Sequence, residues 1–209
     1  MPEERIGIVG GTFDPVHNGH LSLGRSVSNA LKLDRVLFMP TGNPHFKLDQ
    51  QVTPAAQRME MVRLAIEGIP GFELDCREVR RQGVTYTVDT LEELRAQYPD
   101  AWLFFIIGAD SAETLVHWKA AQRMAQLATF VVTQRPGVDF DEVRRVHAQS
   151  PIEFDLEFVD VPQLDISSTD IRRAIACGES VEGLMPHAVI EYIRSEGLYR
   201  SPVASDDTR

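Results

Sequence analysis

Two histidines near the start of the chain follow a short apolar run that ends in a pair of glycines. The segment reads GIVGGTFDPVHNGHLSLGR, and its histidines are His17 and His20. Glycine lets backbone N–H groups approach an anion closely, so Gly10 and Gly11 could form a phosphate cradle to which Thr12 adds a hydroxyl donor. His20 would lie in the first turn of a helix, where the dipole favours an anion, and both imidazoles could donate hydrogen bonds to phosphate oxygens.

Two other interpretations of this segment stay open. A glycine pair at the end of a strand is also typical of a tight turn. Two histidines could bind zinc, but zinc needs further ligands, and neither a cysteine nor a second His-Xaa-Xaa-His pair stands nearby. The GxxxxGK[ST] spacing of a P-loop and the GxGxxG of dinucleotide-binding enzymes are both absent, which argues against these two classes.

A second polar cluster, LDISSTDIRRAI, lies near the C-terminus. Ser167 and Asp170 form a Ser-x-x-Asp pattern that predicts the capped start of a helix. Capping needs one hydroxyl, whereas Ser168 and Thr169 supply two more, and Arg172 projects from the same helix start. Hydroxyls, free backbone N–H groups and a guanidinium could therefore converge on a polyphosphate here, with capping alone as the alternative.

Three further candidates stand in other segments. Asp110, after Gly108 in IIGADS, could accept hydrogen bonds from ribose hydroxyls or help to hold a metal, or it could cap a helix. Trp118 could stack on a flat heteroaromatic ring, although most tryptophans serve only packing. Lys47 in NPHFK could reach a phosphate, although a lone lysine is usually a solvated charge.

These candidates depend for their positions on strands that alternate with helices. Apolar and alternating runs predict strands over residues 5–9, 35–40, 72–79, 102–108, 129–137 and 152–161. Apolar residues at helical spacing predict helices over residues 19–31, 54–66, 87–98, 139–149, 168–177 and 187–196. This order predicts an α/β fold in which helices cover both faces of a mostly parallel sheet. Ligands bind such sheets beyond the carboxyl ends of the strands, where we expect the chemistry to lie.

Helix starts and one inward helix face can also be predicted. Thr53 is expected to cap the second helix, with Pro54 at its first position. Thr87 or Asp89 is expected to cap the third helix. The inward face of the second helix is expected to carry apolar residues at helical spacing: Ala55, Met59, Val62 and Ile66.

Composition and charge limit the classes to which the chain can belong. Its 209 residues suffice for one domain with a full core, and a hydrophobic fraction of 43% with 25% charged residues is typical of a soluble globular protein. A net charge of −10 argues against nucleic-acid binding, which needs spread-out Lys and Arg. A phosphorylated small molecule needs only a local positive cluster and stays compatible with this charge.

Membrane insertion and an oxidising compartment are both disfavoured. The longest apolar run, residues 101–107, suits a strand, and the N-terminal MPEER is unlike a signal peptide. Cys76 and Cys177 show no paired spacing, which favours a reducing compartment. We therefore expect a cytoplasmic protein that binds neither nucleic acid nor membranes.

The two polar clusters resemble a known superfamily. GGTFDPVHNGHL together with ISSTDIR is similar to the nucleotidyltransferases related to class I aminoacyl-tRNA synthetases. Within it, PTGNPHFK, YTVDTL, FIIGADS followed by a tryptophan, RPG and IEYIRSEGLY resemble the bacterial nicotinate-nucleotide adenylyltransferases. The resemblance implies a Rossmann-like, doubly wound α/β sheet in a single nucleotidyltransferase domain over residues 1–200, with the helices from about residue 168 forming part of the ATP site. Residues 201–209 are expected to form a disordered tail.

The resemblance implies an adenylyltransferase that joins ATP and nicotinate mononucleotide to give nicotinate adenine dinucleotide and pyrophosphate, in NAD biosynthesis. The mononucleotide phosphate would attack the α-phosphorus of ATP directly and in line, without a general base. Mg²⁺ would be held through the substrate phosphates rather than by protein ligands. A nicotinamide-mononucleotide or phosphopantetheine adenylyltransferase and a non-catalytic nucleotide sensor are the alternatives, and assembly into a homo-oligomer is left open.

The resemblance also implies roles for individual residues. The catalytic set acts on the phosphates and consists of His17, His20, Lys47 and Arg172. The ATP-binding set consists of Gly10, Gly11, Thr12, His17, His20, Gly108, Asp110, Ser168, Thr169 and Arg172. The mononucleotide-binding set consists of Lys47, Tyr86, Thr87 and Trp118.

One segment departs from the family pattern. Members of the family often have Pro-Pro-His-Lys in the loop after the second strand, whereas this chain has Pro44-His45-Phe46-Lys47. Alignment on the lysine puts Phe46 where the histidine usually stands. The role of His45 therefore stays open, because a shifted loop could still present it.

Overall fold

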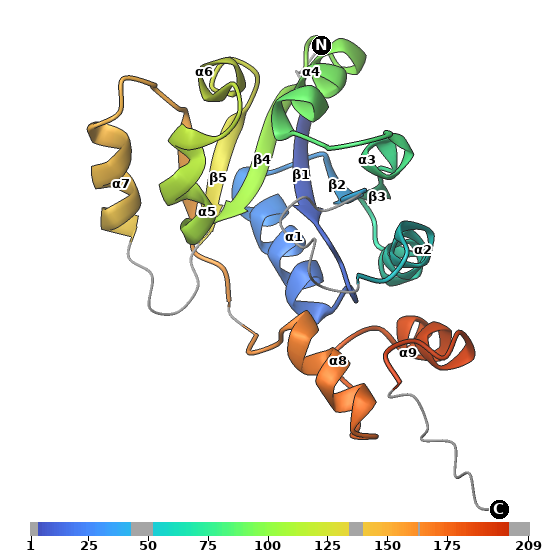
Figure 1. The fold of residues 1–209 in the computed structure, drawn as a ribbon. Coiled ribbons are helices and arrows are strands. Elements are labelled where there is room, and N and C mark those ends of the chain that lie inside the picture. The colour runs from blue at the N-terminus through green and yellow to red at the C-terminus, as the bar shows by residue number, and fades with distance from the viewer. Residues whose placement is uncertain (1–3, 43–51, 134–139, 163, 201–209) are drawn as a thin grey trace, which may run out of the picture.

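The residues that the structure describes build a six-stranded parallel sheet at the centre of the molecule (Figure 1). The computed structural model describes residues 4–42, 52–133, 140–162 and 164–200. The strands are β1 (Arg5–Gly11), β2 (Arg35–Pro40), β3 (Phe72–Leu74), β4 (Trp102–Gly108), β5 (Thr129–Thr133) and β6 (Leu156–Val159). All neighbouring strands pair in parallel, in the order β3-β2-β1-β4-β5-β6. This is the doubly wound order, so the predicted Rossmann-like α/β fold is confirmed.

Helices connect the strands and cover both faces of the sheet. They are α1 (Asn18–Leu31), α2 (Ala55–Ile66), α3 (Arg77–Arg80), α4 (Thr87–Gln97), α5 (Ala109–Thr114), the 3₁₀ turn η2 (Leu115–His117), α6 (Ala121–Met124), α7 (Phe140–Ala148), α8 (Ser168–Ala176) and α9 (His187–Ser195). None of the helices in the described ranges combines the length and the apolar composition that crossing a bilayer requires.

Two apolar cores lie on opposite faces of the sheet because successive strand residues point to opposite sides. Ile6 and Ile8 of β1 belong to the core that also contains residues of α4, α5 and α7. Val9 of the same strand belongs to the second core, which contains residues of α1, α2, α8 and α9. In Figure 1 the helices α8 and α9 lie together at one end of the sheet, and α8 begins next to the start of α1.

The predicted strand over residues 72–79 is wrong beyond β3. Asp75 accepts hydrogen bonds from the backbone N–H of Arg77 at 2.9 Å and from the guanidinium of Arg77 at 2.6 Å. A carboxylate that bonds the backbone two residues onward stabilises a turn, so the chain leaves the sheet and continues as α3. The predicted strand over 152–161 is shortened to β6, and residues 134–137 of the predicted strand over 129–137 lie outside the described residues.

The predicted helix caps are confirmed at α8 and wrong at α2 and α4. The Ser167 side chain accepts a hydrogen bond from the backbone N–H of Asp170 at 3.1 Å and caps α8. Residue 54 is the N-cap of α2 and Tyr86 is the N-cap of α4, and neither makes a side-chain capping bond. The backbone N–H of Thr53 instead donates to the Asp14 carboxylate at 3.2 Å, and the Thr53 side chain is hydrogen-bonded to Tyr199.

The inward face of α2 differs from the apolar stripe expected for it. Val62 and Ile66 are buried as expected, whereas Ala55 and Met59 are only half-buried. The position that sequence analysis missed is Arg58, whose exposed fraction is 1%. Hydrophobic spacing cannot reveal a buried cation, since charged side chains are buried only where partners surround them.

Gly24 of α1 gives a test of how closely the helix packs on the sheet. A Cβ atom at this position would lie 2.8 Å from the buried ring of Phe38 in β2. Alanine favours a helix over glycine by about 1 kcal/mol, but forcing a methyl group into a packed core costs about 1–3 kcal/mol. We expect the packing cost to exceed the helix gain, so that Gly24→Ala lowers the free energy of unfolding by up to about 2 kcal/mol in urea titrations.

Asn29→Ala, at an exposed position of the same helix, is the matched control. It is expected to change the free energy of unfolding by no more than about 0.5 kcal/mol. A Gly24→Ala variant that is as stable as the parent would show that α1 and β2 are not in tight contact.

Candidate active site

The candidate site lies where the strand order reverses, between the neighbouring strands β1 and β4. β1 pairs with β2 on one side and with β4 on the other, and the chain crosses in opposite directions from this point. Gly10 and Gly11 end β1, and Gly108 ends β4 at the same edge of the sheet. Crevices of this kind, at the carboxyl ends of parallel strands, are the usual ligand sites of doubly wound sheets.

The two terminal glycines of β1 differ in the space available for a side chain. A Cβ atom on Gly11 would lie 3.2 Å from the ring of Phe13, whereas a Cβ on Gly10 would meet only the ring of Phe105 at 3.8 Å. Packing therefore constrains residue 11, and Gly10 is exposed at the sheet edge. Thr12 follows as a half-exposed residue, so all three predicted cradle residues lie together at the carboxyl end of β1.

The two histidines stack on each other at the start of α1. Their ring centroids are 3.7 Å apart with an interplanar angle of 27°, and His17 is only 6% exposed. The backbone N–H of His17, the N-cap of α1, donates to Nδ1 of His20 at 3.2 Å. A ring nitrogen that accepts a hydrogen bond carries no proton, so the proton of the His20 ring lies on Nε2. The start of α1 thus supplies a neutral imidazole that can donate from Nε2.

The second predicted cluster contacts the first, although more than 150 residues separate them in sequence. The Ser168 hydroxyl donates to the carbonyl of Pro15 at 2.9 Å. Arg172 donates from Nη1 to the carbonyl of Asp14 at 2.7 Å and from Nη2 to the Thr169 hydroxyl at 3.4 Å. The start of α8 is therefore bonded directly to the loop that leads into α1.

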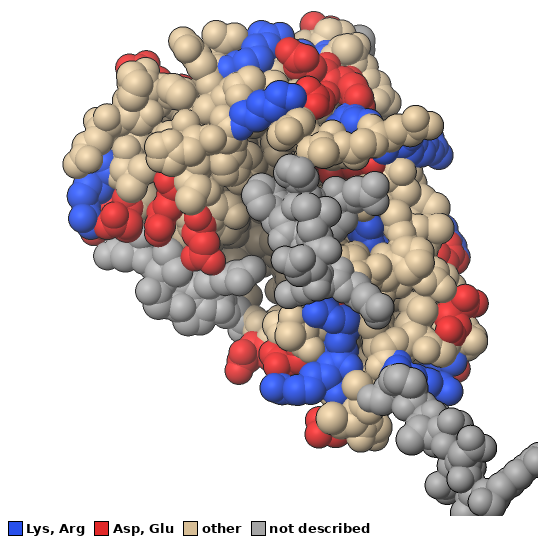
Figure 2. Space-filling model, viewed as in Figure 1, with Lys and Arg blue, Asp and Glu red and all other residues tan. Residues whose placement is uncertain are grey.

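Further contacts hold the C-terminal helices against α1. The backbone N–H of Asn18 donates to the carbonyl of Leu184 at 2.9 Å, and the Asn18 side chain donates to the carbonyl of Gly183 at 2.8 Å. Lys and Arg side chains gather over α8 on the face drawn in Figure 2, and α8 contains Arg172 and Arg173. Arg173 pairs with Asp170 of the same helix at 2.9 Å, whereas Arg172 donates to a carbonyl and a hydroxyl, so Arg172 supplies the positive charge beside the two helix starts.

The buried side chain of Arg58 links three chain segments beside the candidate site. Its guanidinium donates to four backbone carbonyls, at 2.7 Å to Thr12 and at 2.8 Å to Thr41, Gly42 and Thr53. Burial lowers the pKa of Arg58, and the charge of Asp14 acts in the opposite direction. A single buried cation therefore joins the loop after β1, the residues that follow β2 and the segment that precedes α2.

On the β4 side, Asp110 is the second residue of α5 and is exposed. Gly108 is the N-cap of α5, so the alternative in which Asp110 caps the helix is wrong. A Cβ atom on Gly108 would meet nothing within 4 Å, and the space around this backbone is open to a ligand. Because β4 pairs with β1, Asp110 lies at the same edge of the sheet as the glycines of the first cluster.

The segments that carry Tyr86, Thr87 and Trp118 are brought together by Lys119. The Nζ of Lys119 lies 3.7 Å from the centroid of the Tyr86 ring. Trp118 directly precedes this lysine and donates from Nε1 to the Thr114 hydroxyl at 3.3 Å. Thr87 is the first residue of α4, where backbone N–H groups have no partner within the helix. The sequence pattern did not single out Lys119.

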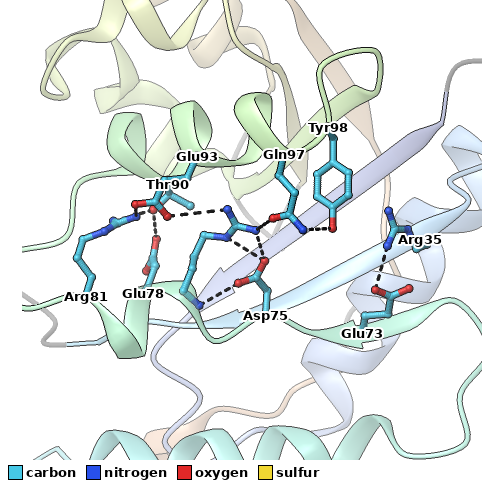
Figure 3. A network of polar contacts seen from close by, with 10 residues as sticks. Arg35, Glu73, Asp75, Glu78, Arg81, Thr90, Glu93, Gln97 and Tyr98 are labelled. Atoms are coloured by element: carbon cyan, nitrogen blue, oxygen red, sulfur yellow. Dashed lines mark hydrogen bonds and ion pairs between the residues drawn. The ribbon is translucent and has the colours of Figure 1, made fainter.

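A polar network fastens α4 to α3 and β3 (Figure 3). Thr90 of α4 donates to Glu78 of α3 at 2.8 Å and accepts from Arg81 at 3.0 Å. Arg77 pairs with Asp75 at 2.6 Å and donates to Gln97 of α4 at 2.8 Å. The network holds the start of α4, and with it residues 86 and 87, in place beside the sheet.

One residue of the predicted site has no described position. Lys47, in both the catalytic and the mononucleotide-binding set, lies outside the described residues, as does His45. Within the described ranges, no group of three or more His, Cys, Asp or Glu side chains could hold a metal ion.

Comparisons with known proteins define the class and then the family. A family model described as cytidylyltransferase-like matches residues 8–174, which extend from β1 into α8. Together with the candidate site at the carboxyl ends of β1 and β4, this match marks a nucleotidyltransferase. A probable nicotinate-nucleotide adenylyltransferase of Clavibacter sepedonicus is 44% identical over 97% of this chain and 97% of the relative. Another, of Thermomicrobium roseum, is 43% identical over 94% and 92%. The chain therefore belongs to the nicotinate-nucleotide adenylyltransferase family, and the predicted resemblance is confirmed.

Solved structures support the fold. The Plasmodium falciparum nicotinic acid mononucleotide adenylyltransferase complexed with NaAD gives a TM-score of 0.75 over 94% of this chain and 98% of that chain, at 18% identity. A putative nicotinate-nucleotide adenylyltransferase from Vibrio parahaemolyticus gives a TM-score of 0.68 over 95% and 96%, at 23% identity. At these identities the likeness concerns the fold alone.

Glu78 provides a pH-dependent test of the network beside α4. Burial raises the pKa of the Glu78 carboxyl, whose exposed fraction is 7%, against the opposing effects of Thr90 and Arg81. The folded state thus binds this proton more tightly than the unfolded state, so this contribution to the free energy of unfolding falls as the pH rises above about 4. Glu78→Gln removes this titrating carboxyl and its pH-dependent contribution. We therefore expect the free energy of unfolding of the variant to rise relative to that of the parent between pH 4 and pH 7.

Urea titrations at several pH values measure this difference. Glu179→Gln, at an exposed position, is the control and is expected to show a constant difference. A Glu78→Gln variant that loses stability relative to the parent as the pH rises would contradict the assignment.

Proposed function

We propose that the chain transfers the adenylyl group of ATP to the 5′-phosphate of nicotinate mononucleotide, which yields nicotinate adenine dinucleotide and pyrophosphate in NAD biosynthesis. The observation that carries this proposal is the direct hydrogen bonding of α8 to the loop before α1. It brings two helix starts, an imidazole pair and a guanidinium to one edge of the sheet. Membership of the family supports the reaction and both small-molecule substrates.

The triphosphate would lie between the starts of α1 and α8. His20 would donate from Nε2 to the α-phosphate, with His17 stacked behind it as a second imidazole. A neutral donor strengthens its bond as negative charge builds up on the transferring group, without holding the substrate by a fixed charge. Thr169, the free N–H groups of α8 and the remaining donors of Arg172 would bind the β- and γ-phosphates.

Ser168 has a narrower part in this arrangement than the family pattern implies. Its single hydroxyl proton is donated to the carbonyl of Pro15. We therefore assign Ser168 first to the attachment of α8 to the loop, and only second to the phosphates. Gly10, Gly11 and Thr12 would line the nucleotide on the β1 side, and Gly108 and Asp110 would hold its ribose.

The chemistry is a direct displacement. An oxygen of the mononucleotide phosphate forms a bond to the α-phosphorus, and the bond from the α-phosphorus to the oxygen that bridges to the β-phosphate breaks. Pyrophosphate leaves with the electron pair of that bond. The attacking phosphate monoester is already anionic, so alignment and charge stabilisation supply the catalysis and no general base is needed.

The mononucleotide would bind on the β4 side, between Trp118 and the start of α4. Trp118 would stack on the pyridine ring, and the backbone at Tyr86 and Thr87 would receive the nicotinate carboxylate. Lys119 adds a positive charge over the Tyr86 ring. A cation beside the proposed binding site of the pyridine ring favours the carboxylate of nicotinate over the neutral amide of nicotinamide.

Mg²⁺ would arrive with ATP, held by phosphate oxygens and water, and would neutralise part of the phosphate charge. Lys47 is proposed to reach the phosphates from the segment after β2. A single nucleotidyltransferase domain in the cytoplasm is the setting that we propose for the reaction.

A comparison of substrates tests the proposed function. Pyrophosphate release is measured with ATP and each of nicotinate mononucleotide, nicotinamide mononucleotide and phosphopantetheine. We expect the highest kcat/KM with nicotinate mononucleotide. A higher value with either of the other two would assign the chain to a sister activity, and tight ATP binding without any turnover would make it a nucleotide sensor.

His20→Ala tests the role of the imidazole pair. Removal of one donor to the developing charge lowers kcat by about 100-fold, because oxyanion donors of this kind contribute about 2.7–4 kcal/mol in the transition state. The KM for ATP is expected to change far less, since the other phosphate contacts remain. His187→Ala, at an exposed position of α9, is the matched control and should retain the parental kcat. An unimpaired kcat in His20→Ala would refute the assigned role.

A further inference from the structure

The C-terminal segment after α9 reaches back to the loop that carries the two histidines. The Tyr199 hydroxyl donates to Oδ1 of Asp14 at 2.6 Å, across 185 residues of sequence. The Tyr199 ring packs against the same apolar core as α1 and α9. The motif IEYIRSEGLY ends at this tyrosine, and the proposed reaction assigns no role to it.

The side chain of Asp14 is almost fully buried in the loop between β1 and α1. Its exposed fraction is 4%, and its second carboxylate oxygen accepts the backbone N–H of Thr53 at 3.2 Å. The buried guanidinium of Arg58, bonded to four backbone carbonyls, is its electrostatic partner. Burial and the bond to Asp14 raise the pKa of Tyr199, which keeps the hydroxyl protonated as a donor.

The backbone of Asp14 is directly attached to the phosphate-binding groups of α8. Its carbonyl accepts from Arg172 at 2.7 Å, and the carbonyl of the next residue, Pro15, accepts from Ser168 at 2.9 Å. His17 follows two residues later. A shift of the Asp14 carboxylate therefore moves the backbone to which Arg172 is bonded and the loop that places the imidazoles.

We propose that Tyr199 is a positioning residue for the triphosphate, because its bond to Asp14 sets the spacing between the imidazoles of α1 and Arg172 of α8. The inference rests on the proposed function, in which these groups bind ATP. Of the residues assigned to the mononucleotide, Tyr86 and Trp118 in the described part of the chain pack against the first core, whereas Tyr199 packs against the second core on the opposite face of the sheet. Its loss should therefore affect ATP and spare the mononucleotide, whereas a purely structural hydroxyl would affect neither in the folded protein.

Tyr199→Phe in the full chain tests the proposal, since it keeps the packed ring and removes the donor. We expect the affinity for ATP alone, measured by calorimetry, to fall by at least about 5-fold, as loss of a bond to a buried charge suggests. The KM for ATP should rise similarly, while the KM for the mononucleotide changes by less than about 2-fold. Asp14→Asn, whose amide oxygen accepts only a weaker neutral bond, should reduce the ATP affinity as well.

Two control variants separate positioning from stability. Tyr192→Phe removes a hydroxyl from the neighbouring helix α9 and should bind ATP as the parent does. Leu198→Ala removes apolar packing next to Tyr199 and should lower the unfolding midpoint without changing the ATP affinity below that midpoint.

A double variant, Tyr199→Phe with Arg172→Ala, tests the path of the effect. If Tyr199 acts through the loop to which Arg172 is bonded, the combined loss of ATP affinity is smaller than the product of the two single losses. Parental ATP affinity in both Tyr199→Phe and Asp14→Asn, or multiplicative losses in the double variant, would overturn the proposal. A parent that binds ATP but does not turn over nicotinate mononucleotide would refute the proposed function and leave this test intact.

Discussion

The structure depends on hydrogen bonds between two chain segments that lie more than 150 residues apart. Ser168 and Arg172 of α8 donate to the carbonyls of the loop that leads from β1 into α1, so the starts of both helices lie beside this loop at the carboxyl end of β1. Each helix start supplies N–H groups without a partner inside the helix and the positive end of a dipole. Their convergence creates a place for a polyphosphate in a chain whose net charge is −10. Neither helix alone would bind one with the same geometry.

The two helix starts can converge only if the loops beneath them are rigid. The buried side chains of Arg58 and Asp14 hold these loops. Arg58 donates to four carbonyls from three segments, and a lysine could not match this planar arrangement of donors. Burying a guanidinium is costly unless every side is bonded or paired, and Asp14 supplies the opposite charge. Loops that would otherwise be held only by their ends are thereby fixed to one side chain. The bonds of Arg58 therefore explain how loops, rather than strands, can hold the groups of the site in fixed positions.

Most of the fold and the outer part of the site could be predicted from sequence, because both follow from local patterns. The runs at β1, β2 and β4 are apolar and continuous, as buried parallel strands require, and the Ser-x-x-Asp pattern does cap α8. The strand expected over residues 72–79 failed because one carboxylate, Asp75, turns the chain through a local hydrogen bond. Arg58 and Tyr199 were missed for a different reason. Their partners lie far away in sequence, and hydrophobic periodicity cannot identify a buried polar side chain that is satisfied by distant backbone.

The central claim is that α1 and α8 bind different phosphates of one nucleotide. The most direct measurement compares the affinities of the parent and of Arg172→Ala for ATP and for AMP, by calorimetry at fixed ionic strength. If Arg172 binds only the β- and γ-phosphates, the variant loses about 10-fold or more in ATP affinity, since charge-assisted bonds to phosphate are strong, and keeps its AMP affinity. Equal losses for both nucleotides, or no loss for either, would contradict the account.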